Sequence, residues 1–459
     1  MTKVLPLVAL LALAGCASLP ELKWPAFETP AASAVTIQVA PDWWTTYGDP
    51  ALDRMMTEAL ARNADIRLAA ARVDEARANL GLAEGARYPT VEATAGVSRS
   101  RSSGANSFTP PVLLSNKFQA GVLAAYEVDW WGQYRSASQA ARADLLASQL
   151  GREVVGNGLA ATVATAWFNL RTLDAQIGLT EQTLANRRQW LDLQRLRQQV
   201  GEVSDYELSQ SEAELAAVEA NHARLVRAVG QQENALAVLL GRSPRQQAED
   251  PLPRGDALPR VPAIPAGLPS DLLTRRPDIR QAEARLTAAD ARIAEAKAAI
   301  YPSLALTANL GSESRALSDL FSGPATVWGL AASLAQTLYN AGRTEAALQA
   351  TVARREQALI GYEQTVRQAF RETLDALVAS RQSREQAEAE ARRVDAQRRA
   401  TALAELRYRN GVTSQLEALD AQRNLYQAEQ NRLDAELARL AASVDLYQAL
   451  GGGWQADRP

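Results

Sequence analysis

The sequence predicts an α+β membrane protein, in which three copies of the chain close a twelve-stranded transmembrane β-barrel that continues into a long barrel of α-helices. Three observations support this fold class. The chain is an internal duplication, each half contains two segments that alternate in polarity with period two, and each half contains a proline-free stretch far longer than a globular helix. Irregular segments between these elements predict an equatorial domain around the helices.

The duplication is visible in short motifs that recur at a spacing of about 210 positions. Asp65-Ile66-Arg67 recurs as Asp278-Ile279-Arg280, and Tyr88-Pro89-Thr90 recurs as Tyr301-Pro302-Ser303. The repeating unit of about 200 residues is much longer than the 20–50 residues of a solenoid repeat. The chain is therefore interpreted as a duplicated domain.

Each unit contains two segments in which every second residue is apolar. This alternation predicts half-buried strands, and a length near ten residues is that of a tilted strand crossing lipid. Aromatic residues lie at both ends of the segments, with Tyr88 and Tyr301 at one end and Phe118 and Trp328 at the other, and resemble interfacial girdles. The apolar positions are Val91, Ala93, Ala95 and Val97; Phe118, Ala120, Val122, Ala124, Tyr126, Val128 and Trp130; Leu304, Leu306, Ala308 and Leu310; and Trp328, Leu330, Ala332 and Leu334.

Four strands per chain cannot close a barrel, because membrane barrels of this kind start at eight strands. Three copies of the chain would provide twelve. The alternative is a fragment of a soluble β-sandwich, but two isolated hairpins separated by long helices do not make one.

Two stretches without proline, 132–200 and 342–410, predict helices of about 70 residues and roughly 105 Å. The shorter helical segments of each unit, such as 50–87, are expected to stack beside the long helix. No compact domain needs such helices, whereas a tube that crosses the periplasm does. Apolar residues at heptad spacing in the final helix predict a coiled-coil seam. They are Leu419, Tyr426, Leu433, Leu440 and Tyr447, with Leu416, Leu437 and Val444 on companion positions.

The N-terminus is interpreted as a signal peptide over residues 1–15. Lys3 precedes an apolar run that is too short to span a bilayer as a helix. The run ends in Leu13-Ala14-Gly15-Cys16, which resembles a bacterial lipobox, so Cys16 is expected to become the lipidated first residue. By resemblance to bacterial lipoproteins, Ala17 favours the outer membrane. The alternative is an ordinary signal peptide with a chance cysteine.

These features divide the mature chain into five parts. We expect an N-terminal anchor and equatorial segment over 16–49, a first unit over 50–241, a linker over 242–269, a second unit over 270–451 and a tail over 452–459. Each unit has the order helix, two strands, long helix, helix. The linker is rich in proline and polar residues and is expected to cross the outside of the tube.

The composition argues against catalysis. His222 is the only histidine and falls in a heptad stripe, so it is interpreted as a packed polar residue. One histidine and one cysteine cannot form a His/Cys metal site or a Ser-His triad, and no phosphate-binding glycine loop of the usual form occurs. A net charge of −3 offers no polybasic surface for nucleic acid. We expect no enzymatic activity, no cofactor and no metal.

The longest motif of the chain runs over residues 267–280 and reads GLPSDLLTRRPDIR. Together with Trp43-Trp44, Tyr47-Gly48-Asp49-Pro50, Glu127-Val128-Asp129-Trp130-Trp131-Gly132, Tyr339-Asn340-Ala341-Gly342-Arg343 and Leu419-Asp420-Ala421-Gln422, it resembles the TolC/OprM-type outer membrane factors, in the branch of NodT-like efflux lipoproteins. The resemblance covers essentially the whole mature chain. It implies a homotrimer that forms the passive exit channel of a tripartite efflux pump for small molecules or drugs. The implied partners are a periplasmic adaptor and an inner-membrane pump of the RND type.

The resemblance also implies functional residues at the periplasmic end of the helices. The implied adaptor contacts are Val200, Gly201, Glu202, Asn410, Gly411 and Val412. The implied gate residues are Tyr408, which matches a tyrosine of the closed state, and the acidic residues Glu417, Asp420 and Glu207. Threefold symmetry turns each pore-facing carboxylate into a ring of three that attracts cations. Thr413 stands where some members have arginine, so an arginine lock is not expected there.

Three other functions remain open at this stage. A polypeptide secretion duct would share the fold, and neighbouring genes would distinguish it. A wholly periplasmic coiled-coil scaffold is disfavoured by the alternating strands, and a hydrolase is disfavoured by the scarcity of catalytic side chains.

Overall fold

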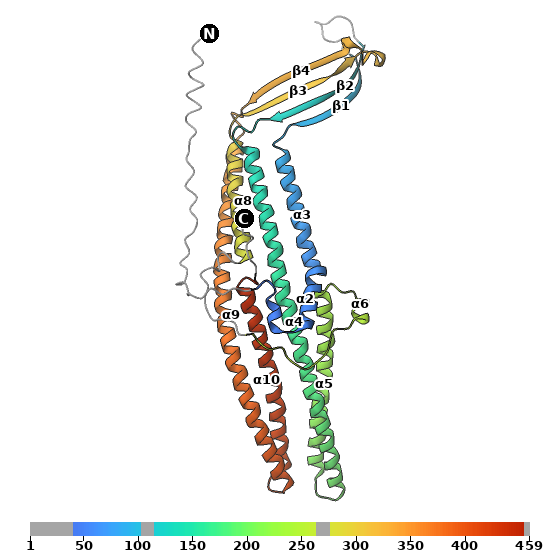
Figure 1. Cartoon of the computed structure of the whole chain (residues 1–459), viewed down its shortest axis with the longest axis vertical. Helices are drawn as coiled ribbons and strands as arrows, with labels where there is room; N and C mark the ends of the chain where they lie inside the picture. Colours follow the sequence, from blue (N-terminus) through green and yellow to red (C-terminus); the bar gives the residue numbers. More distant parts are fainter. Residues whose placement is uncertain (1–39, 102–113, 263–275, 454–459) are drawn as a thin grey trace.

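The computed structural model describes residues 40–101, 114–262 and 276–453. The molecule is elongated, with a β-sheet at one end and long helices that run to the other end (Figure 1). In chain order the described elements are η1 (Trp43–Tyr47), α2 (Pro50–Arg62), α3 (Ala64–Gly85), β1 (Thr90–Arg101), β2 (Leu114–Glu127), α4 (Gln133–Gln199), α5 (Asp205–Leu239), α6 (Pro244–Glu249), α8 (Pro277–Ala298), β3 (Ser303–Ser314), η2 (Leu317–Asp319), η3 (Gly323–Ala325), β4 (Thr326–Ala335), α9 (Arg343–Arg409) and α10 (Gln415–Ala449).

The two longest helices are α4 and α9, each of 67 residues. At 1.5 Å per residue each is about 100 Å long, as the proline-free stretches predict. Helices α3 and α5 lie along α4, and α8 and α10 lie along α9 (Figure 1). The predicted stacking of two shorter helices beside each long one is therefore confirmed. None of the described helices is both long and apolar enough to cross a membrane.

The predicted helix over residues 50–87 is interrupted at Asn63, which separates α2 from α3. The side-chain oxygen of Asn63 accepts hydrogen bonds from the backbone N–H groups of Asp65 and Ile66, at 2.8 and 3.3 Å. Its amide nitrogen donates to the carbonyl oxygen of Leu239, beside the end of α5, at 2.9 Å. The prediction of one continuous helix is wrong because Asn63 caps α3 and holds it against α5.

The four strands form one antiparallel sheet in the order β1-β2-β3-β4. Strand β2 pairs with β3, so the two units share a sheet and do not form separate hairpins. Strand β2 ends at Glu127, before the predicted end at Trp130, because the carboxylate of Asp129 accepts hydrogen bonds from the first backbone N–H groups of α4.

The strand register gathers the alternating apolar residues on one face of the sheet. Ala93 lies opposite Val122, which lies opposite Leu310, and Leu310 lies opposite Trp328. The residues between them form a polar face, which includes Glu92, Thr94, Gln119, Thr307, Asn309 and Ser333. A sheet with one apolar and one polar face is the arrangement that the sequence predicts for strands between lipid and an aqueous lumen.

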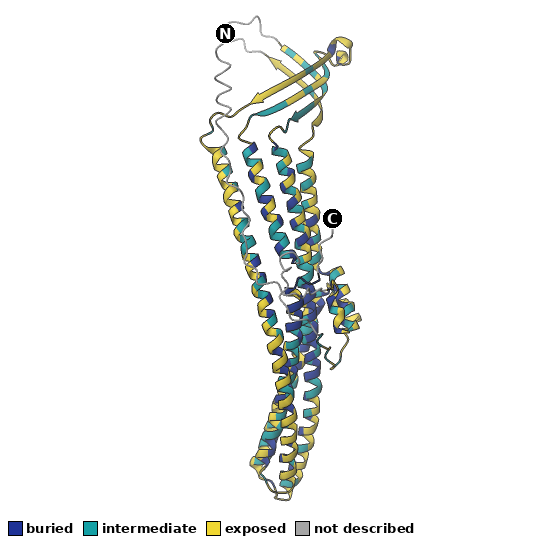
Figure 2. Cartoon of the chain, turned by 60° about the vertical axis from the view of Figure 1, so that its left-hand side comes forward, coloured by how far each residue is buried: buried dark blue, intermediate teal, exposed yellow. Residues whose placement is uncertain are grey.

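The main hydrophobic core lies midway along the helices, where buried residues concentrate (Figure 2). Trp43 stacks on Tyr447 of α10 with ring centroids 5.0 Å apart. The hydroxyl of Tyr47 lies 2.6 Å from that of Ser443, and burial raises the pKa of Tyr47. Trp167 of α4 donates to the carboxylate of Asp49 at 2.7 Å. Residues 40–49 therefore tie α4 to α10; residues 16–39 of the expected equatorial segment lie outside the described residues.

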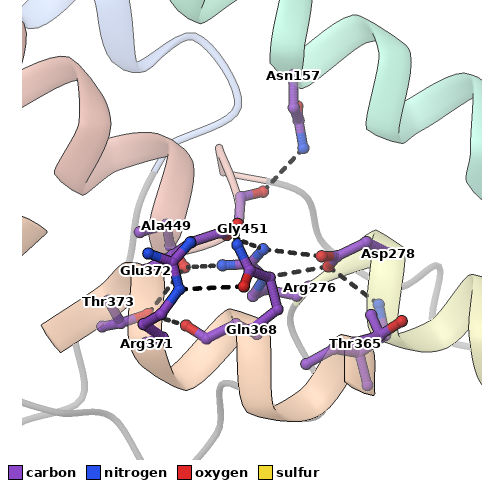
Figure 3. A network of polar contacts seen from close by, with 12 residues as sticks. Asn157, Arg276, Asp278, Thr365, Gln368, Arg371, Glu372, Thr373, Ala449 and Gly451 are labelled. Atoms are coloured by element: carbon purple, nitrogen blue, oxygen red, sulfur yellow. Dashed lines mark hydrogen bonds and ion pairs between the residues drawn. The ribbon is translucent and has the colours of Figure 1, made fainter. Parts of the chain in front are cut away.

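A buried arginine joins three helices near this core (Figure 3). Arg276, at the start of α8, forms ion pairs with Asp278 at 2.8 Å and with Glu372 of α9 at 2.7 Å. It also donates to the carbonyl oxygen of Ala449, at the end of α10, at 3.2 Å. Thr373 donates to the same carbonyl at 3.4 Å. The arginine thus fixes the start of α8, the middle of α9 and the end of α10 relative to one another.

Candidate functional site

The candidate site lies at the end of the molecule opposite the sheet, where two helical hairpins turn (Figure 1). The first hairpin consists of α4 and α5, and the second consists of α9 and α10. Gly201 and Gly411 have φ values of 82° and 66°, a left-handed backbone that favours glycine at helix ends. All six predicted adaptor-contact residues are exposed at these turns, which leaves them accessible to a partner: Val200, Gly201, Glu202, Asn410, Gly411 and Val412.

Tyr408, the first predicted gate residue, links the two hairpins. It lies on α9, and its hydroxyl is 3.2 Å from the amide nitrogen of Gln194 and 3.4 Å from a guanidinium nitrogen of Arg197, both on α4. Arg197 also lies over the tyrosine ring, 5.6 Å from its centroid. Trp190 of α4 packs at 5.2 Å from the same ring. Tyr408 therefore contacts the other hairpin through both its ring and its hydroxyl.

The predicted acidic residues Glu417 and Asp420 lie on the first turns of α10 and are half-exposed. Each has an arginine partner within its own hairpin. Glu417 pairs with Arg407 at 3.5 Å and accepts a hydrogen bond from Thr413, and Asp420 pairs with Arg423 at 3.2 Å. Both carboxylates therefore have an arginine partner, although position 413, where some family members have arginine, is a threonine in this chain.

The carboxylate of Glu207 makes contacts of a different kind from those of Glu417 and Asp420. Its carboxylate belongs to a capping box at the start of α5, where it accepts hydrogen bonds from the backbone N–H and the hydroxyl of Ser204, both at 2.9 Å. Its carbonyl oxygen accepts a hydrogen bond from Gln415 of α10 at 3.0 Å. Glu207 therefore contributes to the contact between hairpins through its backbone.

Leu416 does not belong to the packed seam that the heptad pattern predicts. Its exposed fraction is 50%, against 1% for Leu419. The position beside Leu416 is occupied by Gln415, which is buried and donates to the hydroxyl of Ser211 on α5 at 2.7 Å. At this level the seam is polar, and a heptad pattern of apolar residues does not detect it.

Further contacts between the hairpins involve residues that the sequence did not single out as functional. Tyr426 of α10 lies 2.9 Å from the hydroxyl of Thr180 on α4 and accepts from the amide of Asn221 on α5 at 2.6 Å. Arg423 forms an ion pair with Glu214 of α5, with Nε 3.1 Å from Oε1. Hydrogen bonding to Glu214 raises the pKa of Arg423. The sequence predicts Tyr426 as a seam residue from its heptad position alone. The one local sign of a polar contact at this position is the hydroxyl of the tyrosine, which the leucines of the seam lack.

Arg187 is the most deeply buried charge of this contact. Its side chain is 5% exposed, lies on α4 and donates to the side-chain oxygen of Gln422 on α10 at 2.6 Å. Burial lowers the pKa of Arg187. A cavity of about 600 Å³ lies beside it between the hairpins, and Trp190 and Tyr408 contribute to its walls. At this end of the molecule the hairpins are therefore joined by polar contacts around a partly open space.

A membrane-type sheet continuous with long paired helices, whose far ends meet through polar contacts, defines the protomer of an outer-membrane conduit. The chain belongs to the outer membrane efflux protein family, whose model matches residues 55–242 and 268–452. It functions as the outer-membrane exit channel of an efflux pump and is located in the outer membrane, extending into the periplasm. The fold class predicted from the sequence is confirmed.

Relatives and solved structures agree with this family. The antibiotic efflux pump outer membrane protein ArpC of Pseudomonas putida is 36% identical over 99% of this chain and 96% of its own length. The cation efflux system protein CusC of Escherichia coli is 33% identical over 99% of both chains. Among solved structures, the outer-membrane channel OprN is 29% identical, covers 95% of this chain and all of its own, and superposes with a TM-score of 0.87.

Proposed function

We propose that three copies of the chain assemble into the exit channel of a tripartite pump, and that a periplasmic adaptor and an inner-membrane pump of the RND type deliver small molecules or drugs to it. The sheet supports the trimer. Strands β1 and β4 are its edges and pair with no further strand among the described residues, so three sheets joined edge to edge provide the twelve strands of a closed barrel. The channel is passive and performs no chemical step.

Export of small molecules is favoured over polypeptide secretion, the alternative function of this fold. The relatives that span nearly the whole chain are named for the efflux of antibiotics, toluene and cations. These substrates are small, and no two of the three are chemically alike. The shared fold therefore supports an exit channel whose substrate is chosen by its partners.

The contacts between the two hairpins hold the closed state of the channel in this proposal. The observation that supports it is the set of polar bonds from α9 and α10 to α4 and α5, at Tyr408, Gln415, Gln422, Arg423 and Tyr426. Opening swings the α9–α10 hairpin away and exchanges these bonds for bonds to water, which costs little per bond. The adaptor acts on the exposed turns at Gly201 and Gly411.

The acidic residues of α10 select cations at the constriction in this proposal. In a trimer, Glu417 and Asp420 form two carboxylate rings, about 4.5 Å apart along the axis at 1.5 Å per residue. Arg407 and Arg423 beside them reduce the negative charge of each ring in the closed state.

Cys16 anchors the chain to the membrane by lipid in this proposal. It lies outside the described residues, and the lipobox supports this role.

Cross-linking the hairpins tests the gate. Ser211 and Gln415 touch across them, and the mature chain has Cys16 as its only cysteine, so Ser211→Cys with Gln415→Cys introduces one reactive pair. A short, cleavable thiol cross-linker is expected to hold planar-bilayer conductance at its low closed level, with recovery after cleavage. Each single cysteine variant is the control. If the cross-linked trimer opens as often as the controls, the hairpins do not separate and the gate proposal fails.

A further inference from the structure

A second cavity lies at the other end of the helices, at the junction with the sheet. It has a volume of about 510 Å³ and is lined by the end of β2, the starts of α4 and β3, and the segment that leads from β4 into α9. This volume is in the range of small-molecule sites. None of the predicted gate or adaptor-contact residues lines this cavity.

One wall of this cavity is a stack of aromatic rings. Trp131 stacks on Tyr301 with centroids 4.5 Å apart and on Trp130 with centroids 6.4 Å apart. The indole nitrogen of Trp131 donates to the carbonyl oxygen of Pro302 at 2.8 Å, which fixes the central ring. The terminal ring, Trp130, is 72% exposed, and Tyr339 lines the cavity from the opposite segment. Because Trp131 is stacked between Tyr301 and Trp130, the exposed Trp130 is the ring of this stack with a face left for a ligand, and such a face attracts organic cations.

The charged residues that line the cavity are all acidic: Glu127, Asp129 and Glu345. Glu127 accepts a hydrogen bond from the hydroxyl of Tyr134 at 2.8 Å, which contributes, after burial, to raising the pKa of Tyr134 to about 12. Asp129 is held by backbone N–H groups of α4. No lysine, arginine or histidine is among the lining residues. Aromatic faces and carboxylates without a basic residue favour a positively charged ligand over an anion or a neutral molecule.

The position of the cavity relative to the sheet limits the source of such a ligand. The apolar face of the sheet ends at Tyr126, Leu304 and Leu334, and the cavity begins directly beyond these residues. In an outer-membrane channel this is the level where lipid headgroups of the periplasmic leaflet meet water. Tryptophan and tyrosine prefer that level because one part of the ring is apolar and the other polar.

We propose that this cavity binds a primary ammonium group, with the exposed ring of Trp130 covering the cation and the carboxylates accepting its N–H bonds. A primary ammonium group at this level of the membrane has two possible sources: the headgroup of an amine-bearing phospholipid such as phosphatidylethanolamine, and a soluble amine. This proposal depends on the outer-membrane location of the chain and does not depend on the proposed gate.

Two measurements on the purified full-length protein separate these sources. Native mass spectrometry with equimolar phosphatidylethanolamine and phosphatidylglycerol of the same acyl chains measures lipid preference, and calorimetric titration with ethanolamine measures binding of the soluble amine. A lipid site retains phosphatidylethanolamine over phosphatidylglycerol by about fivefold, the factor of one cation–π contact. A solute site binds ethanolamine with no lipid preference. If the protein shows neither, the proposal is overturned.

Trp130→Ala and Glu345→Gln are expected to reduce the measured preference or binding by about two- to fivefold each. The matched control is Trp328→Ala, because Trp328 is 73% exposed but lies on the sheet away from the cavity. Trimer assembly and melting temperature are measured on each variant to show that it folds. An equal loss in the Trp328→Ala protein contradicts the site, because the effect then belongs to exposed tryptophan in general.

Discussion

Arg423 of α10 and Glu214 of α5 form an ion pair that joins the two helical hairpins, with Nε of the arginine 3.1 Å from Oε1 of the glutamate. The same guanidinium pairs with Asp420 at 3.2 Å. One side chain therefore connects the contact between the hairpins with a predicted pore acid. If the hairpins separate as proposed, the first pair breaks and the second remains, so opening is expected to change the charge environment of Asp420.

Arg423→Ser is expected to favour the open channel. The arginine is half-exposed, and pairs of this kind contribute roughly 0.2–1 kcal/mol, so the open population per protomer rises by a factor of about 1.4 to 5. Open probability in planar bilayers is the measurement. The matched control is Arg398→Ser, because Arg398 pairs with Glu429 at 2.7 Å within the α9–α10 hairpin. An equal effect of both variants would show that the Arg423 pair has no special role in closing.

Glu417→Ala combined with Asp420→Ala is expected to reduce cation selectivity and to weaken block by multivalent cations. Removal of both carboxylates leaves Arg407 and Arg423 at the constriction, so each protomer becomes more positive there. Reversal potentials across a salt gradient measure the change. The control is Glu385→Ala with Glu388→Ala, an exposed acidic pair at the same spacing on α9. Unchanged selectivity in the first double variant would remove these residues from the constriction.

Two kinds of variant at the Gly411 turn test separately the effect of backbone strain and the effect of adaptor contact. Gly411→Asn keeps a residue that tolerates positive φ, whereas Gly411→Val places a β-branched side chain at a φ of 66° and is expected to destabilise the turn by about 1–2 kcal/mol. Val412→Asp changes only an exposed side chain. If the adaptor docks here, Val412→Asp lowers adaptor capture in a pull-down and leaves channel conductance intact. Full capture by this variant and by Val200→Asp would locate the docking surface elsewhere.

Arg276→Met is expected to destabilise the protein more than the loss of a surface ion pair would. The change leaves the carboxylates of Asp278 and Glu372, 29% and 38% exposed, without their buried partner; breaking a fully buried pair costs about 3–5 kcal/mol, and this partial exposure sets the expected cost at or below the lower end of that range. The melting temperature followed by circular dichroism reports the loss. Arg280→Met is the control, because its pair with Glu283 is partly exposed and contributes little. Similar melting temperatures for the two variants would mean that the buried network is not stabilising.

Cys16→Ser is expected to abolish lipid attachment and to leave an unprocessed precursor. Metabolic labelling with a fatty acid measures attachment, and the mass of the chain measures processing. Ala17→Ser, one position further, is the control and retains the label. Unchanged labelling of Cys16→Ser would refute the assignment of the anchor.

Several features of this protein follow from the sequence because their signals are local. The absence of proline over 132–200 and 342–410 predicts both long helices, and the structure contains them at 67 residues each. Period-two alternation predicts the four strands. Glycine after each long helix predicts the turns at Gly201 and Gly411, because the left-handed backbone there favours a residue without a Cβ.

Only the tertiary structure decided which distant residues meet. Tyr408, Glu417 and Asp420 could be singled out by resemblance, but the bonds of Tyr426 to α4 and α5 and the burial of Arg187 could not. The capping role of Glu207 is a local signal, because Ser204 and Glu207 have the spacing of a capping box. A charged residue on a helix has the same sequence pattern whether it faces water or a partner. Its partner depends on how two helices pack and on their relative axial shift, which long-range contacts set. The pairing of β2 with β3 and the helix break at Asn63 depend on the same long-range packing.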